Sequence, residues 1–215
     1  MTWGEGMILL LNVFEAIGTI AFAISGALIG IEKKLDIFGI SFLSITTALG
    51  GGIFRDILIG NTPPTAFVNP QYMIVAIIVA LITYKFNSKV RKLQGIISLC
   101  DSIGLAVFTA IGANAAFSNG FDAPLIVVAM GVFTGVGGGI LRDVFVKDIP
   151  FVFRKEVYAV ACLIGALAFY FVEDIIPREG ALYVCFLITF ITRILSIKFD
   201  LNLPAKKEVF DRKAV

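Results

Sequence analysis

Seven stretches of this 215-residue sequence are predominantly apolar and long enough to cross a membrane as helices. A helix needs about 20 such residues to span the hydrocarbon core of a bilayer. The runs are too long and too uniformly apolar for the roughly ten-residue alternating strands of a membrane β-barrel. The sequence therefore predicts an all-α polytopic membrane protein with seven transmembrane helices. We expect them at residues 7–31, 37–59, 69–86, 95–117, 123–146, 156–174 and 180–198.

The composition agrees with this prediction and argues against most enzyme classes. Hydrophobic residues make up 58% of the chain and the mean hydropathy is +0.94, whereas soluble domains are roughly 45–50% apolar. Histidine is absent, which removes the commonest general base and transition-metal ligand. The glycine-rich stretch GGGIFRD follows no predicted strand and has no P-loop lysine. We therefore expect no catalytic residue, no bound metal and no cofactor.

Lysine and arginine are distributed unequally between the two sides of the predicted helices. The N-terminus and the loops after spans 2, 4 and 6 contain only Arg178, whereas the other loops and the C-terminal segment contain 14 basic residues. Because basic residues favour the cytoplasmic side, we expect an inner-membrane protein with the N-terminus outside and the C-terminus in the cytoplasm. This asymmetry also accounts for the net charge of +2, so no nucleic-acid partner is needed to explain it.

The first part of the chain recurs in the second part, offset by 86 or 87 residues. A GGGxxRD motif occurs at residues 50–56 and again at 137–143. The other matched positions are Glu15, Gly18, Phe22, Gly26, Ala27, Thr47, Pro63, Tyr72 and Tyr84, which recur as Asp101, Gly104, Phe108, Gly112, Ala113, Thr134, Pro150, Tyr158 and Tyr170. Each copy holds three spans, so the second copy enters the membrane from the opposite face. The sequence thus predicts two inverted three-helix repeats, 1–92 and 93–177, a seventh transmembrane helix, 178–200, and a cytoplasmic tail, 201–215.

The GGGxxRD motifs mark the candidate ion pathway. Three glycines within one span permit a kink or an unwound turn, and irregular backbone at that depth is tolerated where it lines a cavity. Inverted repeats with broken helices place a substrate path near the midplane. We expect the pathway to involve Thr47, Gly50, Gly51, Gly52, Arg55 and Asp56 in the first repeat, and Thr134, Gly137, Gly138, Gly139, Arg142 and Asp143 in the second. The two threonines could equally hydrogen-bond to their own helices.

Charged residues inside the spans cannot plausibly face lipid, because each costs about 2.5–3.5 kcal/mol at a helix centre. Arg55 is expected to pair with Glu15 or Asp101, and Arg142 with the other one. These pairs could line a polar cavity or lock the helices together, and the two roles are compatible. We expect Arg193 to snorkel towards the inner interface. Supporting polar residues are Glu15, Asp101, Lys155 and Glu156, and Asn114 is a weaker pore candidate.

Taken together, these features resemble the prokaryotic branch of the trimeric intracellular cation (TRIC) channels. The two GGGxxRD motifs, the RKEVYA segment at 154–159 and the lone seventh helix carry the resemblance, which covers all seven spans. It implies a homotrimer with a hydrophilic pore in each protomer that conducts monovalent cations, mainly potassium. It also implies glycine-kinked second and fifth helices, with basic pore residues at Arg55 and Arg142.

Two functions remain open from the sequence. The first is a passive channel, with K⁺ or Na⁺ as the permeant ion and membrane lipid and two further copies of the chain as partners. The second is a secondary transporter of a small solute such as an amino acid, because inverted repeats and broken helices are also typical of transporters. Both need a polar site near the midplane of the membrane, so the residues do not separate them.

Overall fold

The structure, a computed structural model, describes residues 3–90, 95–154 and 157–201. Within these ranges it contains helices and no strand. The helices are α1 (Trp3–Glu32), α2 (Ile37–Leu58), α3 (Thr65–Val68), α4 (Gln71–Val90), α5 (Ile96–Ser118), α6 (Pro124–Phe145), α7 (Phe151–Arg154), α8 (Tyr158–Glu173) and α9 (Arg178–Lys198). The seven long helices fall at the seven predicted spans. Sequence reasoning missed the two short helices, α3 and α7, which each follow a GGGxxRD helix.

Five helices, α1, α2, α5, α6 and α9, are long and apolar enough to cross a membrane. The remaining predicted spans coincide with α4 and α8, whose described apolar stretches, Gln71–Phe86 and Tyr158–Glu173, are shorter. Large hydrophobic side chains are exposed along the outer faces of the long helices, among them Phe38, Phe133 and Leu187. A membrane protein places such side chains against lipid or against neighbouring subunits.

Local sequence signals define where the two motif helices begin. Asp36 caps α2, because its Oδ1 atom accepts a hydrogen bond from the Gly39 amide at 2.7 Å. Pro124 occupies the first turn of α6, where its missing amide proton removes no helical hydrogen bond. The two helices therefore begin at equivalent positions of the two repeats, and the GGGxxRD motif lies near the C-terminal end of each.

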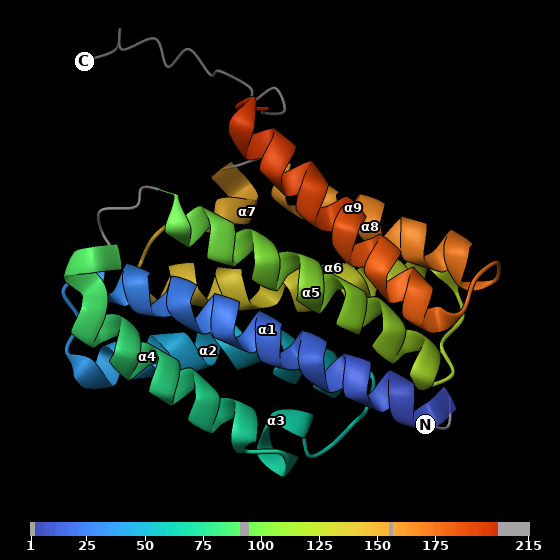
Figure 1. The fold of residues 1–215 in the computed structure, drawn as a ribbon, viewed down its shortest axis with the longest axis horizontal. Helices are drawn as coiled ribbons and strands as arrows, with labels where there is room; N and C mark the ends of the chain where they lie inside the picture. The colour runs from blue at the N-terminus through green and yellow to red at the C-terminus, as the bar shows by residue number, and fades with distance from the viewer. Residues whose placement is uncertain (1–2, 91–94, 155–156, 202–215) are drawn as a thin grey trace, which may run out of the picture.

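The bundle has four central helices with one helix packed on each flank. Helices α1, α2, α5 and α6 contact one another, α4 packs against α1 and α2, and α8 packs against α5 and α6 (Figure 1). Helix α9 covers α5 and α8, and among the described helices none packs in the same way on the other flank. The contacts thus follow the duplicated order of the elements, and α9 breaks the symmetry.

Contacts between loops and helix ends show which segments share an end of the bundle. Lys33, after α1, forms an ion pair with Asp148, after α6, with 2.6 Å between Nζ and Oδ2. The guanidinium carbon of Arg178, at the start of α9, lies 5.6 Å from the ring centroid of Phe117, near the end of α5. Helix α1 begins and α9 ends at opposite ends of the bundle (Figure 1). These positions agree with the alternation of loops expected from the sequence.

Candidate ion pathway

The two GGG segments lie where α2 and α6 cross in contact. A Cβ atom added at Gly51 would collide with the Thr134 carbonyl oxygen, and one added at Gly138 would collide with the Thr47 carbonyl oxygen. Reciprocal contacts also join α1 to α5, where Phe22 and Phe108 stack with ring centroids 5.4 Å apart. Equivalent residues of the two repeats therefore contact each other reciprocally, as residues do in a symmetric dimer interface.

The prediction that an unwound turn breaks the helices at the glycines is wrong. Helices α2 and α6 run as continuous α-helices through residues 50–52 and 137–139. Gly51 and Gly138 instead allow two backbones to approach more closely than any side chain would permit. Asp56 and Asp143 consequently do not lie in the first turn of a new half-helix, since both precede the C-terminal ends of unbroken helices.

The Arg-Asp pair of each motif fixes the short helix that follows it. In the first repeat, Asp56 Oδ1 accepts a hydrogen bond from Arg55 Nε at 2.8 Å, and Asp56 Oδ2 accepts one from the Thr65 amide of α3 at 2.7 Å. In the second repeat, the same oxygens of Asp143 accept bonds from Arg142 Nε at 2.8 Å and from the Phe151 amide of α7 at 2.9 Å. Each aspartate is thus a structural bridge, with each of its two oxygens accepting a hydrogen bond.

Arg142 is the centre of a dry ionic cluster. Its side chain is fully buried, and Nη1 lies 2.6 Å from both Asp101 Oδ1 and Ser25 Oγ. Its guanidinium carbon lies 5.0 Å from the centroid of the Phe151 ring. Ser25 is on α1, so this cluster joins the two repeats. Two carboxylates therefore offset one buried cation, which also donates a hydrogen bond to Ser25 of the other repeat.

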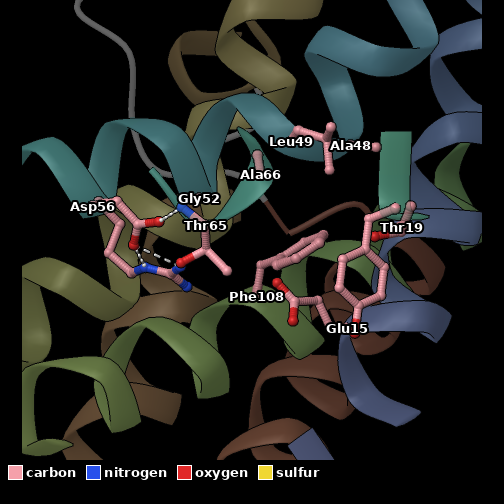
Figure 2. Close-up of a pocket in the computed structure, with 11 residues that line it drawn as sticks. Glu15, Thr19, Ala48, Leu49, Gly52, Asp56, Thr65, Ala66 and Phe108 are labelled. Carbon is pink, nitrogen blue, oxygen red and sulfur yellow. Dashed lines mark hydrogen bonds and ion pairs between the residues drawn. The ribbon is translucent and has the colours of Figure 1, made fainter. Parts of the chain in front are cut away.

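Arg55 occupies a different environment, because a polar cavity of about 220 Å³ lies beside it. Helices α1, α2 and α5 line the cavity with Glu15, Arg55, Asp56 and Asn114, and it reaches exposed Asn61 and Asn119 in the loops. A smaller cavity of about 20 Å³ continues it towards Gly52 and shares Glu15, Arg55, Asp56 and Thr65 with it. Figure 2 shows Glu15, Asp56 and Phe108 gathered around this smaller cavity.

The predicted pairing of arginines with acids is only partly correct. Arg142 does pair with Asp101, although both belong to the second repeat. Arg55 pairs with its neighbour Asp56 at 2.8 Å, and within the described ranges no basic nitrogen lies within 4 Å of the Glu15 carboxylate. Glu15 instead lies beside the Tyr72 hydroxyl, which donates to Asn12 Oδ1 at 3.3 Å. The equivalent acids Glu15 and Asp101 therefore have different surroundings.

Tyr158 packs next to Gly139 in the second repeat, and Arg193 packs on its ring. A Cβ atom at Gly139 would lie 2.8 Å from the Tyr158 hydroxyl, whereas one at Gly52 would meet only Arg55 Nη2 at 3.8 Å. Arg193 of α9 is 3% exposed, and its guanidinium carbon lies 4.8 Å from the Tyr158 ring centroid. The expectation that Arg193 snorkels to the interface is therefore wrong.

The remaining predicted residues separate into three groups. Thr47 and Thr134 are fully buried and donate to the Leu43 and Met130 carbonyls of their own helices, each at 2.6 Å. Gly50 faces Leu141, and Gly137 lies against Gly51. Lys155 and Glu156 lie outside the described residues. The structure thus brings Gly52, Arg55 and Asp56 to the cavities and keeps the two threonines away from them.

Sequence reasoning missed several polar residues around these sites. Ser25 and Thr19 lie on an apolar helix, at positions where the second repeat has Ile111 and Leu105. Polar side chains in spans are costly and tend to be functional or paired. Aligning the repeats and noting where only one copy is polar would have singled out both residues.

Three comparisons place the chain among known proteins. A profile of the family described as Glycine transporter matches residues 12–88 and 98–174, one segment within each predicted repeat. The UPF0126 inner membrane protein YadS of Escherichia coli (strain K12) is 40% identical over 195 residues, which cover 88% of this chain and 93% of that protein.

Two solved structures extend the likeness to the fold. A prokaryotic TRIC channel crystallised in 0.5 M KCl is 38% identical, with a TM-score of 0.85 over 91% of this chain and 100% of that one. The TRIC trimeric intracellular cation channel orthologue from Rhodobacter sphaeroides is 34% identical, with a TM-score of 0.83 over 89% and 98% of the two chains. This chain therefore belongs to the prokaryotic TRIC channel family.

Proposed function

We propose that the protein is a monovalent cation channel, permeable to K⁺ and Na⁺, with one pathway inside each protomer of a homotrimer. Seven helices cross the membrane in this proposal, as two inverted three-helix repeats and α9. The supporting comparisons are with proteins described as TRIC cation channels, one of them as trimeric. No bound cofactor takes part. The exposed apolar faces of the long helices are suited to lipid and to neighbouring protomers.

The observation that carries this proposal is the polar cavity within the bundle. It extends from the exposed loop residues Asn61 and Asn119 to Arg55 and Glu15, which belong to helices long and apolar enough to span a membrane. A cavity lined by charged residues between apolar, membrane-length helices is typical of an ion or substrate path. In the second repeat, the equivalent arginine, Arg142, is fully buried together with Tyr158. We therefore propose that the cavity beside Arg55 is one mouth of the pathway.

Reconstitution tests the channel function directly. The purified protein in planar bilayers bathed in KCl should produce discrete single-channel currents, because a conducting pore passes ions without a conformational cycle for each ion. The reversal potential in a KCl gradient should lie towards the K⁺ equilibrium potential. Bilayers treated with detergent and lipid alone serve as the control. Uptake of labelled glycine into liposomes, in the absence of any such currents, would contradict the channel proposal.

The orientation makes a separate prediction. A reporter fused after Val215 should read cytoplasmic, and one inserted within residues 118–122 should read external, because the basic residues concentrate on one side. Alkaline phosphatase and green fluorescent protein fusions at both sites measure this, since they are active on opposite sides of the inner membrane. Finding the two sites on the same side would exclude the inverted repeat.

A secondary transporter is the second candidate. The family description Glycine transporter favours it, and so does the presence of Glu15 and Arg55 in one cavity, since a carboxylate and a guanidinium together suit a zwitterion. Uptake of labelled glycine that depends on a Na⁺ or proton gradient would support this function. Currents that are indifferent to glycine would count against it.

A further inference from the structure

Several oxygen-bearing side chains line the two adjacent cavities, among them Glu15, Thr19 and Asn114. Glu15 lines both cavities, Thr19 lines the smaller one and Asn114 lines the larger one. Glu15 and Thr19 are one helical turn apart on α1, whereas Asn114 comes from α5. The smaller cavity, at about 20 Å³, has room for about one water-sized particle. Glu15 therefore lies in both cavities, with Thr19 in the smaller one and Asn114, from the other repeat, in the larger one.

Two of these oxygens are buried without a protein partner. Thr19 is 0% exposed and Asn114 is 4% exposed. Within the described ranges, neither Thr19 Oγ1 nor Asn114 Oδ1 has a hydrogen-bond partner. Buried polar atoms are nearly always satisfied, and exceptions call for a water, an ion or a function. Thr47, Thr109 and Thr134, on the same set of helices, all donate to backbone carbonyls.

The charge available at this site is that of Glu15. Asp56, Asp101 and Asp143 each form an ion pair with an arginine at 2.6–2.8 Å. Within the described residues, the Glu15 carboxylate has no basic nitrogen within 4 Å. A cation that enters the larger cavity therefore meets one carboxylate, that of Glu15, which is not in an ion pair with a basic side chain of the described residues.

The ligand set matches a monovalent cation better than a divalent one. Divalent ions such as Ca²⁺ take about 6–8 oxygen ligands, commonly with several carboxylates. No group of three or more His, Cys, Asp or Glu residues that could hold a metal occurs in the described parts of the chain. One carboxylate with neutral hydroxyl and amide oxygens binds a cation more weakly than several carboxylates do. Arg55 lines the same cavities, and its positive charge weakens cation binding further. Weak binding suits a permeant ion, which must leave the site again.

We propose that Glu15, Thr19 and Asn114 form a binding site where a monovalent cation is partly dehydrated. Glu15 supplies the charge, and the Thr19 hydroxyl and the Asn114 amide oxygen replace water. Asp56, by contrast, is paired with Arg55 and accepts a hydrogen bond from α3, so the site does not draw its charge from it. The site rests on the proposed channel function and assigns that function its cation-binding residues.

Thallium tests the site independently of conduction, because Tl⁺ substitutes for K⁺ and scatters X-rays anomalously. Crystals of the full chain grown with Tl⁺ should show an anomalous peak in the cavity, near Glu15, Thr19 and Asn114. The peak should disappear in Glu15→Gln and weaken in Thr19→Val, which keeps the side-chain shape. A Tl⁺ peak at Asp56 instead, or none in the cavity, would overturn the site.

Conductance provides the second measurement. Glu15→Gln should lower the single-channel K⁺ conductance at low salt by roughly fivefold, the effect of one nearby unit charge in a hydrated space. The loss should shrink at high salt, because counter-ions screen the charge. Glu5→Gln, the same change at an exposed position of the same helix, should leave the conductance unchanged. Thr19→Val should lower conductance without this salt dependence.

The outcomes separate this site from the channel function itself. A wild-type protein that conducts K⁺ while Glu15→Gln conducts equally well at low salt overturns the site and leaves the channel standing. A wild-type protein without currents overturns the channel, and the site's role in conduction with it. Displacement of Tl⁺ by glycine would identify a zwitterion site and contradict the cation assignment. Trimer assembly of each variant, measured by size-exclusion chromatography in detergent, shows that misfolding does not explain the result.

Discussion

Arg142→Gln is expected to destabilise the protein by about 3–5 kcal/mol, the usual effect of removing one partner from a buried ion pair. Arg142 is fully buried, and the substitution leaves Asp101 and Asp143 in a dry environment without their cation. It also removes the bond to Ser25 that joins the repeats. Thermal unfolding in detergent and the yield of assembled protein measure this loss.

Arg55→Gln is the matched control, because it makes the same change at the equivalent position of the first repeat. Asp56 would keep the Thr65 amide as a donor, and the adjoining cavity of about 220 Å³ gives it access to water. We therefore expect Arg55→Gln to assemble and melt nearly as the parent does, while its K⁺ conductance changes. Equal destabilisation by both substitutions would show that the two arginines have the same structural role.

The sequence predicted much of the fold, because the signals for membrane helices are strong and local. Long apolar runs located the seven long helices, and the duplicated motifs indicated that α2 and α6 would occupy equivalent places. Helices α3 and α7 are only four residues each, and no periodic pattern identifies so short an element. Their positions depend on bonds from the Asp56 and Asp143 carboxylates, which sequence spacing does not reveal.

The candidate site was harder to predict, because equivalent residues differ in their surroundings. The motifs suggested that Arg55 and Arg142 would have one role, yet the first lies beside a cavity and the second has no exposed surface. In the second repeat, Tyr158 lies next to Gly139, and Arg193 of α9 packs on its ring. Helix α9, which lies outside the duplication, therefore gives Tyr158 a contact that a comparison of the two repeats does not reveal.

Gly51→Ala is expected to destabilise the protein by about 1–3 kcal/mol, the usual range for overpacking a filled interface. The new methyl group would collide with the Thr134 carbonyl oxygen. Backbone has no rotamer with which to move away, so α2 and α6 must separate. If the glycines served to break the helix, alanine would instead stabilise it by about 1 kcal/mol. The sign of the change in thermal stability therefore distinguishes the two roles.

Gly52→Ala is the control, since it raises helix propensity equally one residue further along α2. Its methyl group would meet only Arg55 Nη2, at 3.8 Å, so it should be neutral or stabilising. The double variant Gly51→Ala with Gly138→Ala adds a further test, because the two glycines pack at one crossing. Separating the helices for the first methyl group also makes room for the second, so the combined loss should be smaller than the sum. Additive losses would mean that each glycine acts within its own helix and that the crossing does not couple the two repeats.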